Sequence, residues 1–356
     1  MSRIRTFLEL AVKQGGSDLH LVTGHAPRIR IHGLLHRVRF RNLSLEDMEQ
    51  ILTEFMDERL WTELNQRMSV DFAYQADGLG RFRVNAFRHV HGLAAVLRVV
   101  PNDIRSVEEL GLPRAINRVL TQPSGLVLVT GPTGSGKSTT LAAMVDHINR
   151  TRRGHIVTIE DPIEFVHPHQ RCVVTQREVG THSPSFSEAL RNALREDPDV
   201  ILVGEMRDLE TIGLALTAAE TGIQVMGSLH THGAVRTIDR IINVFPARRH
   251  DQVRSILAES LKLVVSQQLV PRADSRGRVA VHEVLVNTHA VGSMIRLGKA
   301  HHLGNTIQSG AREGMQGMDA ELKKLVLSEV ITPEEAYHHA IDKGQFSSGL
   351  ARSTAA

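Results

Sequence analysis

Cysteine is almost absent from this sequence. Cys172 is the only one among 356 residues. An intrachain disulfide is therefore excluded, and so is a zinc site built from several thiolates. We expect Cys172 to behave as an ordinary small apolar residue.

Long apolar runs are missing as well. No stretch approaches the ~18 residues that a membrane-spanning helix needs. No apolar signal segment follows Met1 either. We therefore expect a soluble, cytoplasmic protein with no membrane-spanning segment.

The chain also lacks a strong excess of charge of one sign. It has 42 basic and 39 acidic side chains, for a net charge of +3, and aromatic residues make up only 4% of it. A nucleic-acid-binding protein usually shows basic runs or a basic stripe interleaved with aromatics. We predict that nucleic acid is not a partner.

What the sequence does contain is a phosphate-binding motif. The segment GPTGSGKS matches the pattern GxxxxGK[ST] at every fixed position. An apolar stretch typical of a buried strand, 125–130, precedes it, and a predicted helix, 139–149, follows. The alternative is a turn that only joins strand to helix, but such a turn needs neither Lys137 nor Ser138. The predicted nucleotide-binding residues are Gly131, Pro132, Thr133, Gly134, Ser135, Gly136, Lys137, Ser138 and Thr139.

Each part of this loop has a defined chemical role. The glycines allow successive backbone N–H groups to face a phosphate, and the N-terminus of the following helix adds its positive dipole end. Lys137 would reach the β- and γ-phosphates, and the Ser138 hydroxyl would ligate Mg²⁺. The expected ligands are ATP and Mg²⁺.

Carboxylates follow two of the predicted strands. Glu160, Asp161 and Glu164 come just after the strand at 155–159, and Glu205 follows the apolar strand at 200–203. Hydrolysis needs carboxylates near the γ-phosphate, to hold Mg²⁺ through water and to activate the attacking water. The alternative for both groups is a solvated turn.

Two histidines follow the predicted strand at 224–229. At this strand end His230 could sense the γ-phosphate or bridge to Glu205, and His232 lies beside it. With 20 histidines in the chain, the alternative is an incidental pair. No third clustered ligand favours a metal there.

The length of the chain favours two domains. We expect an N-terminal α+β domain over 1–100, a linker over 101–110, an ATPase domain over 111–346 and a flexible tail over 347–356. Strands alternate with helices in the ATPase domain, so a mainly parallel sheet covered by helices is predicted, an α/β fold. Beyond Gly233 we expect mostly helix.

One strand of the N-terminal domain carries paired arginines. Because side chains alternate along a strand, Arg81 and Arg83 share a face opposite Phe82 and Val84. We expect the two arginines to point away from the core.

The motifs together resemble one superfamily. GPTGSGKS, TIEDPIEF, REDPDVILVGEMRDLET and LHT, with SDLHL near the start, are similar to the secretion-type hexameric ATPases, most closely to the PilT family of type IV pilus retraction motors. The resemblance implies a PAS-like N-terminal domain, a RecA-like ATPase domain with a helical C-terminal part, and a homohexamer. It also implies a cytoplasmic location at the inner-membrane pilus base. The partners it implies are a platform protein in that membrane and a paralogous pilus ATPase.

The resemblance also implies roles for the charged residues. Glu164 matches the favoured catalytic base, with Glu160 and Asp161 in support, and Glu205 matches the Walker B carboxylate that holds Mg²⁺ through water. Arg81 and Arg83 would reach the nucleotide of a neighbouring subunit; the alternative is a solvent-facing pair.

Two departures from the family pattern leave alternatives open. Ile223 stands where the histidine box often begins, and Ala290-Val-Gly-Ser293 replaces the Ala-Ile-Arg-Asn motif of retraction motors. The leading hypothesis is an ATP-driven retraction motor for twitching motility. An accessory retraction-ATPase paralogue and a nucleotide-gated binding module with little hydrolysis are the alternatives.

Overall fold

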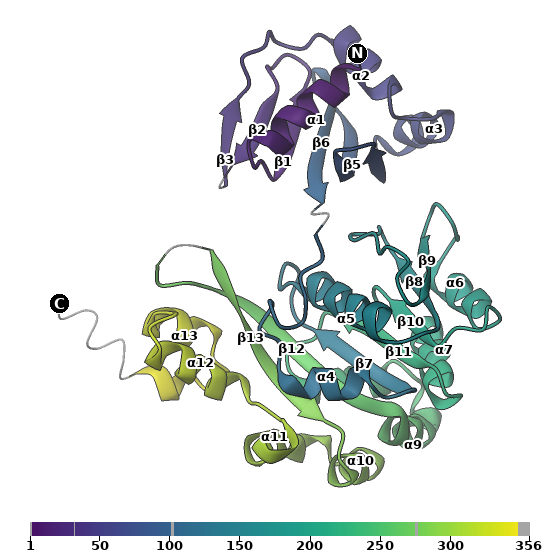
Figure 1. Cartoon of the computed structure of the whole chain (residues 1–356), viewed down its shortest axis with the longest axis vertical. Helices are drawn as coiled ribbons and strands as arrows, with labels where there is room; N and C mark the ends of the chain where they lie inside the picture. The colour runs from purple at the N-terminus through teal and green to yellow at the C-terminus, as the bar shows by residue number, and fades with distance from the viewer. Residues whose placement is uncertain (1, 32, 101–102, 275–276, 348–356) are drawn as a thin grey trace. The chain divides into compact units, whose positions relative to one another are not determined.

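The chain folds into two compact units. The computed structural model describes residues 2–31, 33–100, 103–274 and 277–347. The first unit extends to Asp103 and includes Pro162–Val166, while the second comprises Ile104–Asp161 and the residues from His167 onward (Figure 1). Most of the expected tail, 348–356, lies outside the described residues, as do two residues of the expected linker, 101 and 102.

The first unit is a six-stranded antiparallel sheet in the order β3-β2-β1-β6-β5-β4, packed against three helices. Its elements are α1 (Arg3–Lys13), β1 (Asp18–Val22), β2 (Arg28–Ile31), β3 (Leu34–Arg37), α2 (Leu45–Thr53), α3 (Glu58–Arg67), β4 (Ser69–Ala76), β5 (Gly80–His89) and β6 (Gly92–Val100).

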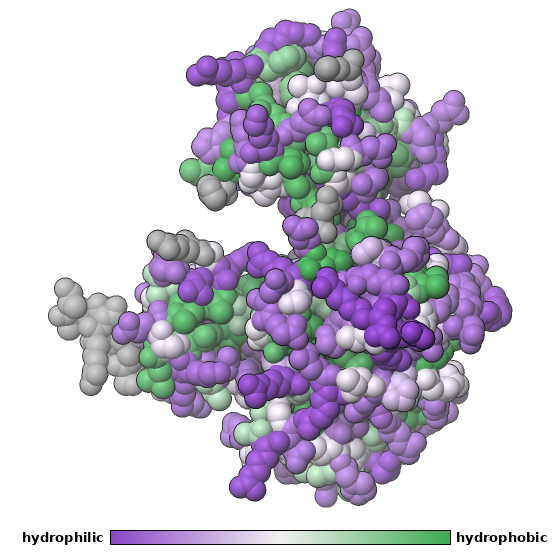
Figure 2. Space-filling model, in the orientation of Figure 1, coloured by the Kyte–Doolittle hydropathy of each residue, from purple (hydrophilic) through white to green (hydrophobic). Residues whose placement is uncertain are grey.

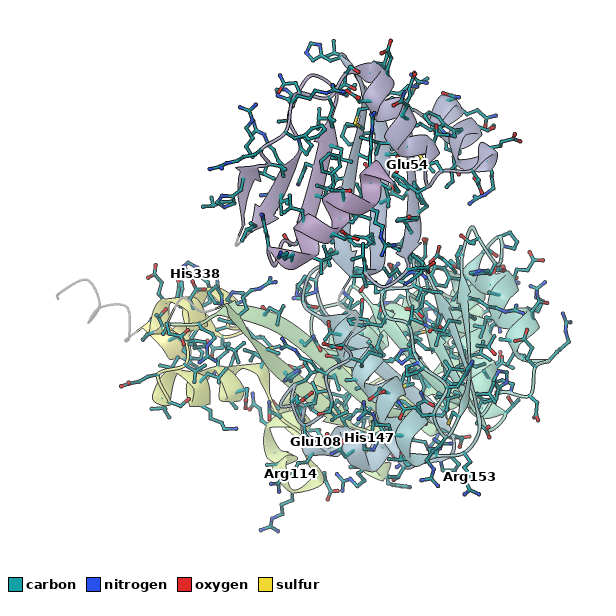
Figure 3. The ribbon with its side chains drawn as sticks, turned by 45° about the horizontal axis from the view of Figure 1, so that its top comes forward. Glu54, Glu108, Arg114, His147, Arg153 and His338 are labelled. Atoms are coloured by element: carbon teal, nitrogen blue, oxygen red, sulfur yellow. The ribbon has the colours of Figure 1, made fainter. Side chains whose placement is uncertain are left out.

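Alternation along β5 places apolar side chains in the core of this unit. Phe82 and Val84 are fully buried, whereas Arg83 is exposed and Arg81 is partly exposed. In the same unit, the carboxylate of Glu54 accepts hydrogen bonds from the backbone N–H groups of Arg3 and Ile4, both at 3.1 Å (Figure 3). This carboxylate fastens the start of α1 to the end of α2.

The second unit is a seven-stranded sheet in the order β13-β12-β7-β11-β10-β8-β9. Every neighbouring pair is parallel except β12 with β13. Its strands are β7 (Gly125–Thr130), β8 (His155–Glu160), β9 (Val173–Glu178), β10 (Val200–Val203), β11 (Gln224–Leu229), β12 (Leu261–Pro271) and β13 (Arg278–Val286). Its helices are α4 (Arg114–Leu120), α5 (Lys137–Thr151), α6 (Phe186–Ala193), α7 (Leu209–Glu220), α8 (Ala234–Asn243), α9 (His250–Ser260), α10 (His289–Arg296), α11 (Leu303–Ser309), α12 (Met318–Leu327) and α13 (Pro333–His339).

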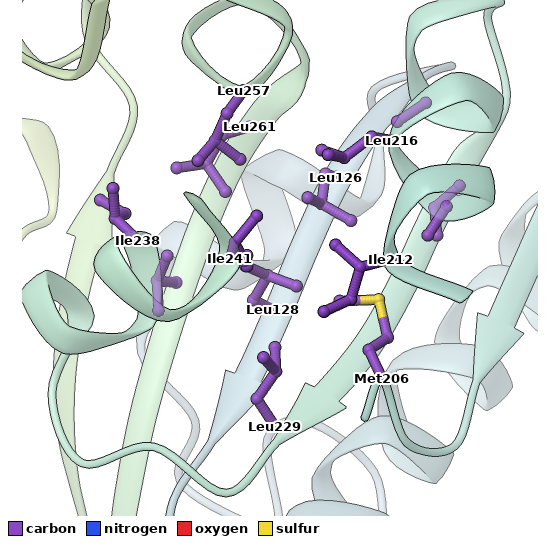
Figure 4. Packing of buried hydrophobic residues seen from close by; sticks show 14 of the residues in the cluster. Leu126, Leu128, Met206, Ile212, Leu216, Leu229, Ile238, Ile241, Leu257 and Leu261 are labelled. Atoms are coloured by element: carbon purple, nitrogen blue, oxygen red, sulfur yellow. The ribbon is translucent and has the colours of Figure 1, made fainter. Parts of the chain in front are cut away.

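Both faces of this sheet are covered by helices. In β7, Leu126 and Leu128 pack in one apolar cluster with α7, α8 and α9, and Val127 and Val129 pack in another with α4 and α5. Figure 4 shows the first cluster closing around Leu126 and Leu128. A strand buried on both faces is a continuous apolar run, as β7 is, so the predicted parallel sheet is confirmed.

The expectation of mostly helix beyond Gly233 is wrong for one segment. β12 and β13 form a long antiparallel hairpin, in which Val270 pairs with Val279 and Leu263 with Val286. A short buried apolar run does not distinguish strand from helix by periodicity alone, and the β-branched residues here favour the strand. Helices α10 to α13 follow it.

The surface is ordinary for a globular chain. Figure 2 shows mainly hydrophilic side chains over the visible face of each unit. Among the described residues, no helix combines the length and apolar character needed to cross a membrane.

Candidate functional site

The phosphate loop lies between β7 and α5. Gly131, Gly134 and Gly136 have φ values of 145°, 78° and 88°, a region that favours glycine over any residue with a Cβ. These turns bring the chain directly into α5, which starts at Lys137 and continues for 15 residues. The loop therefore ends on a helix N-terminus, where N–H groups and the helix dipole favour an anion.

Lys137 is folded back over the loop. Its Nζ donates to the carbonyl oxygens of Gly131 and Pro132, both at 2.9 Å, and the residue is only 8% exposed. A buried ammonium needs such partners. The lysine charge thus lies within the curve of the loop, where phosphate oxygens would bind.

The hydroxyl groups of the loop fit a phosphate ligand. Ser135 is buried, and among the described residues its Oγ has no hydrogen-bond partner. Ser138 is exposed and Thr139 is half-buried. A Cβ built on Gly134 would meet nothing within 4 Å, so the loop is open at this point. A buried hydroxyl without a partner is uncommon and calls for an explanation such as a bound ion.

A polar chain connects the loop to the strand end at β10. The Thr133 Oγ1 lies 3.5 Å from His230 Nδ1, and His230 Nε2 lies 3.1 Å from a carboxylate oxygen of Glu205. Arg207 donates hydrogen bonds to the same carboxylate from two nitrogens, Nε to Oε1 and Nη2 to Oε2, the second at 2.6 Å. Of the predicted residues, the structure therefore brings together Thr133, His230 and Glu205.

The charge state of Glu205 follows from these contacts. Burial raises the pKa of its carboxyl, but the hydrogen bond from Arg207 and the electrostatic interactions with His230 and Arg207 outweigh that effect, so the pKa lies below its ordinary value. Glu205 is therefore an anion at neutral pH, at the edge of the sheet that carries the phosphate loop.

The acidic segment after β8 is divided between the two units. Glu160 ends β8, and its Oε1 accepts from Thr158 Oγ1 at 2.7 Å and from Gln176 Nε2 at 3.2 Å. Asp161 is exposed, and its charge acts on Arg207. Glu164, half-buried, belongs to the Pro162–Val166 segment that groups with the first unit.

Three other candidate residues have no contact with the phosphate loop among those described above. Arg81 and Arg83 lie on β5 of the first unit. His232 is exposed in the loop before α8. Their roles stay predictions.

Two residues at the site were not singled out from the sequence. Arg207 stands two residues after Glu205 and binds it directly. Gln267 of β12 lies under the phosphate loop, 1% exposed. Gln267 is an uncharged polar residue inside an apolar strand. Because buried polar groups need partners, such a residue indicates a specific buried hydrogen bond.

Across the described ranges, no cluster of three or more His, Cys, Asp or Glu side chains is arranged to hold a metal ion. The Ser138 hydroxyl and the Glu205 carboxylate, which the sequence predicts as Mg²⁺ ligands, are oxygen donors of the kind that this ion prefers, and their role stays a prediction. Such a site takes most of its remaining ligands from water and substrate phosphates.

The chain matches a known family along nearly its whole length. The model of the family described as "Type II/IV secretion system protein" matches residues 1–338. The chain belongs to this family. Its members with solved structures include the pilus retraction motor PilT with bound ADP, which matches this chain with a TM-score of 0.91 and 42% identity over 97% of this chain and 98% of that one.

Other members of the secretion family are similar over most of their length. The type IV pilus retraction ATPase PilT of Pseudomonas aeruginosa is 49% identical over 95% of this chain and 98% of its own. A twitching motility protein of Neisseria gonorrhoeae is 50% identical over 88% of this chain and 84% of its own. The Legionella pneumophila ATPase DotB matches with a TM-score of 0.83 and 31% identity, over 94% of this chain and 93% of that one.

Family membership confirms two expectations from the sequence. The fold is the two-part α/β architecture of secretion ATPases, and the enzyme class is that of a P-loop ATPase. The resemblance to the PilT group is confirmed as well.

Proposed function

We propose that this protein is an ATP-hydrolysing motor that powers type IV pilus retraction, and hence twitching motility. The observation that carries the proposal is the 49% identity with a PilT retraction ATPase over 95% of the chain. The contact chain from the phosphate loop through His230 to Glu205 supports it, because a motor needs a link between nucleotide and hydrolytic carboxylates.

The residues of the loop suit the binding of Mg-ATP. The loop N–H groups and Lys137 would hold the phosphates, and Ser138 with Glu205 would hold Mg²⁺, Glu205 through water. Bound Mg²⁺ supplies charge neutralisation on the phosphate oxygens. The Ser135 hydroxyl, buried without a partner in the described chain, is a further phosphate donor in this proposal.

Carboxylates and arginines complete the proposed chemistry. Glu164 is the catalytic base that takes a proton from the attacking water, with Glu160 and Asp161 shaping the field around it. Arg81 and Arg83 stabilise charge on the phosphate of a neighbouring subunit.

The proposed assembly is a homohexamer at the cytoplasmic face of the inner membrane. Its partners are a platform protein of that membrane, which the ring turns as it hydrolyses ATP, and a paralogous pilus ATPase. The lone cysteine supports retraction over pilus extension, because extension ATPases usually carry a four-cysteine zinc insert.

One observation favours the accessory-paralogue alternative. Gly292 occupies α10 where the retraction motif has arginine, and a Cβ there would lie 3.0 Å from the Ala258 carbonyl oxygen. The position faces α9 too closely for a long side chain without a shift of the helix. Gly292 therefore supplies no charged side chain at the position where the family motif has arginine.

Steady-state phosphate release tests the proposal. We expect size-fractionated protein with Mg-ATP to turn over only in the hexamer-sized fraction, and Glu164→Ala to retain binding but lose about 10²-fold or more in kcat. The exposed Glu220 on α7 provides a matched control, since Glu220→Ala should leave turnover unchanged. Binding without turnover in the wild type would favour the nucleotide-gated switch, or an accessory subunit that needs its partner.

A further inference from the structure

The side chain of Gln267 is enclosed between the phosphate loop and α5. Its Nε2 donates to the Ser135 carbonyl oxygen at 2.5 Å, and its Oε1 accepts from Thr140 Oγ1 at 2.8 Å. Gln267 is 1% exposed and Thr140 is 3% exposed. Both ends of one buried amide are therefore used, one on the loop and one on the helix that follows it.

Two loop glycines also lie against Gln267, Gly131 against its backbone and Gly136 against its side-chain amide. A Cβ on Gly131 would lie 2.2 Å from the backbone carbonyl oxygen of Gln267, and a Cβ on Gly136 would lie 3.0 Å from the side-chain Nε2 of Gln267. A Cβ on Gly134 would meet nothing within 4 Å. Gly131 and Gly136 are the two glycines that the GxxxxGK pattern fixes, and Gln267 lies against both of them.

The strand that carries Gln267 is itself firmly held. β12 pairs with β7 as far as Ser266 opposite Thr130, and Gln267 is the next residue, at the point where the loop leaves β7. On its other edge β12 pairs with β13, where His282 lies opposite Gln267. Burial lowers the pKa of His282 to about 4, so this cross-strand neighbour is uncharged at pH 7.

We propose that Gln267 is a positioning residue that holds the phosphate loop in its nucleotide-binding conformation. It touches the loop backbone and Thr140, and it acts through them. The proposal deepens the ATPase assignment and rests on it.

The physical reason is preorganisation. A loop with three residues at positive φ has many accessible conformations when it is not tied down. If only a fraction of molecules hold the competent loop, the apparent affinity falls by that fraction. Without the amide, the Ser135 carbonyl and the Thr140 hydroxyl would also be left unpaired in a buried space, which further destabilises this conformation.

Nucleotide binding by the full-length protein tests the proposal from two sides. We expect Gln267→Met, which keeps the volume but not the amide, to weaken Mg-ADP binding by about tenfold and to raise KM for ATP by a similar factor. Because the loop holds ground state and transition state alike, kcat should change by less than about threefold. Thr140→Val should weaken binding in the same direction, and Thr140→Ser, which keeps the hydroxyl, should restore it.

Gln268→Ala is the matched control. Gln268 is the next residue of the same strand, and its Oε1 bonds to His339 at 2.8 Å, away from the loop. This variant should bind Mg-ADP as the wild type does. If Gln267→Met is too unstable to purify, the comparison of Thr140→Val with Thr140→Ser decides the question alone.

Two results would overturn the proposal: wild-type affinity in both Gln267→Met and Thr140→Val, or equal losses in Thr140→Ser and Thr140→Val. The double variant Gln267→Met/Thr140→Val should lose little more Mg-ADP affinity than either single variant, since both substitutions remove the same contact between the loop, Gln267 and Thr140. Additive losses of affinity would also contradict the proposal. If the wild-type protein binds Mg-ADP but does not hydrolyse ATP, the proposed function is contradicted, whereas the positioning role proposed for Gln267 is not.

Discussion

Glu205 is the residue on which most of the site converges. Arg207 contacts both oxygens of its carboxylate and His230 contacts Oε1, and only 18% of the Glu205 side chain is exposed. Arg207 is a largely exposed partner, with 69% of its side chain accessible. Water can solvate the exposed Arg207 side chain when it leaves Glu205, provided that a cation takes its place beside the more buried carboxylate.

Glu205→Gln tests whether the charge of this residue matters. The amide keeps the size but removes the anion that would hold Mg²⁺ through water. We expect kcat to fall by about 10²-fold or more while Mg-ADP binding stays within a few-fold. Phosphate release and nucleotide titration measure the two effects.

Glu210 supplies the control for this variant. It is an exposed carboxylate on α7 that is also paired with an arginine, Arg191, but it contacts no histidine of the site. Glu210→Gln should retain wild-type turnover, and equal losses in the two variants would remove Glu205 from the proposed mechanism.

At the residue scale, the features that could be predicted are those that a few consecutive residues encode. The phosphate loop is encoded by eight consecutive residues, and the strand before it has the predicted bounds, Gly125–Thr130. A polar residue in an apolar run marks Gln267 as a residue that needs a partner, but the local sequence does not identify that partner, because Ser135 is 132 positions away in the chain. Such a contact depends on β12 lying next to β7, which no local pattern specifies.

Among the elements, α2 shows how far a helix start can be inferred. Ser44 and Asp47 match the capping-box pattern of Ser or Thr followed three residues later by Asp or Glu, and the structure has both halves of the capping box. Asp47 also receives Arg41 at 2.6 Å and Arg3 at 3.0 Å. The hydrogen bond from Arg41, with those from Ser44, holds the pKa of Asp47 well below its ordinary value.

Removing the cap should destabilise the first unit. We expect Ser44→Ala to lower its unfolding free energy by about 1 kcal/mol. Trp61 is the only tryptophan of the chain and packs against the core of this unit, so its fluorescence reports on this unit during urea unfolding of the full-length protein. Glu46→Gln, in the same first turn, is the control and should shift the transition much less.

The sign of the pH effect follows from the direction of the Asp47 shift. A carboxyl whose pKa is lowered by folding stabilises the folded state above its unfolded pKa, and this contribution is lost as the pH falls through the folded value. The unfolding free energy of the wild type should therefore fall in acid as Asp47 becomes protonated. In Asp47→Asn, the unfolding free energy measured by urea unfolding should decrease less steeply as the pH is lowered. Identical slopes would contradict the assignment.

The hairpin of β12 and β13 marks the limit of prediction at this scale. Its apolar run fits a buried helix as well as a strand until β-branched residues such as Val264 and Val265 are weighed. Ser266 and Gln267 interrupt that run with polar groups, and each finds its partner in another element: the N–H of Gly233 for Ser266, the phosphate loop for Gln267. The polar residues are explained by tertiary contacts and not by propensity.

For the whole molecule, the two-unit arrangement places the candidate residues in different bodies. Lys137 and Glu205 belong to the second unit, and Arg81 belongs to the first together with the segment that holds Glu164. Sequence patterns identify such residues one by one, but they do not encode which subunit of a ring supplies each of them. That assignment needs an experiment on mixed assemblies.

Mixing two inactive variants tests whether Arg81 acts on a neighbouring subunit. In the proposed homohexamer, Arg81→Ala subunits keep Glu164, and Glu164→Ala subunits keep Arg81. If the arginine acts in trans, a 1:1 mixture that assembles at random has roughly a quarter of its interfaces complete. We expect ATP turnover to recover to about that fraction of the wild-type rate, measured as phosphate release after co-assembly.

Two comparisons make this result decisive. Arg88→Ala changes another arginine of β5, one that bonds Asn65 at 2.6 Å, and it should stay active alone and in mixtures. If Arg81 acted within its own subunit, every site in the mixture would lack either the arginine or the carboxylate, because each polypeptide carries one defect. No recovery with well-formed mixed rings would then place Arg81 in cis or outside the reaction, whereas recovery requires that one subunit supply the arginine and another the base.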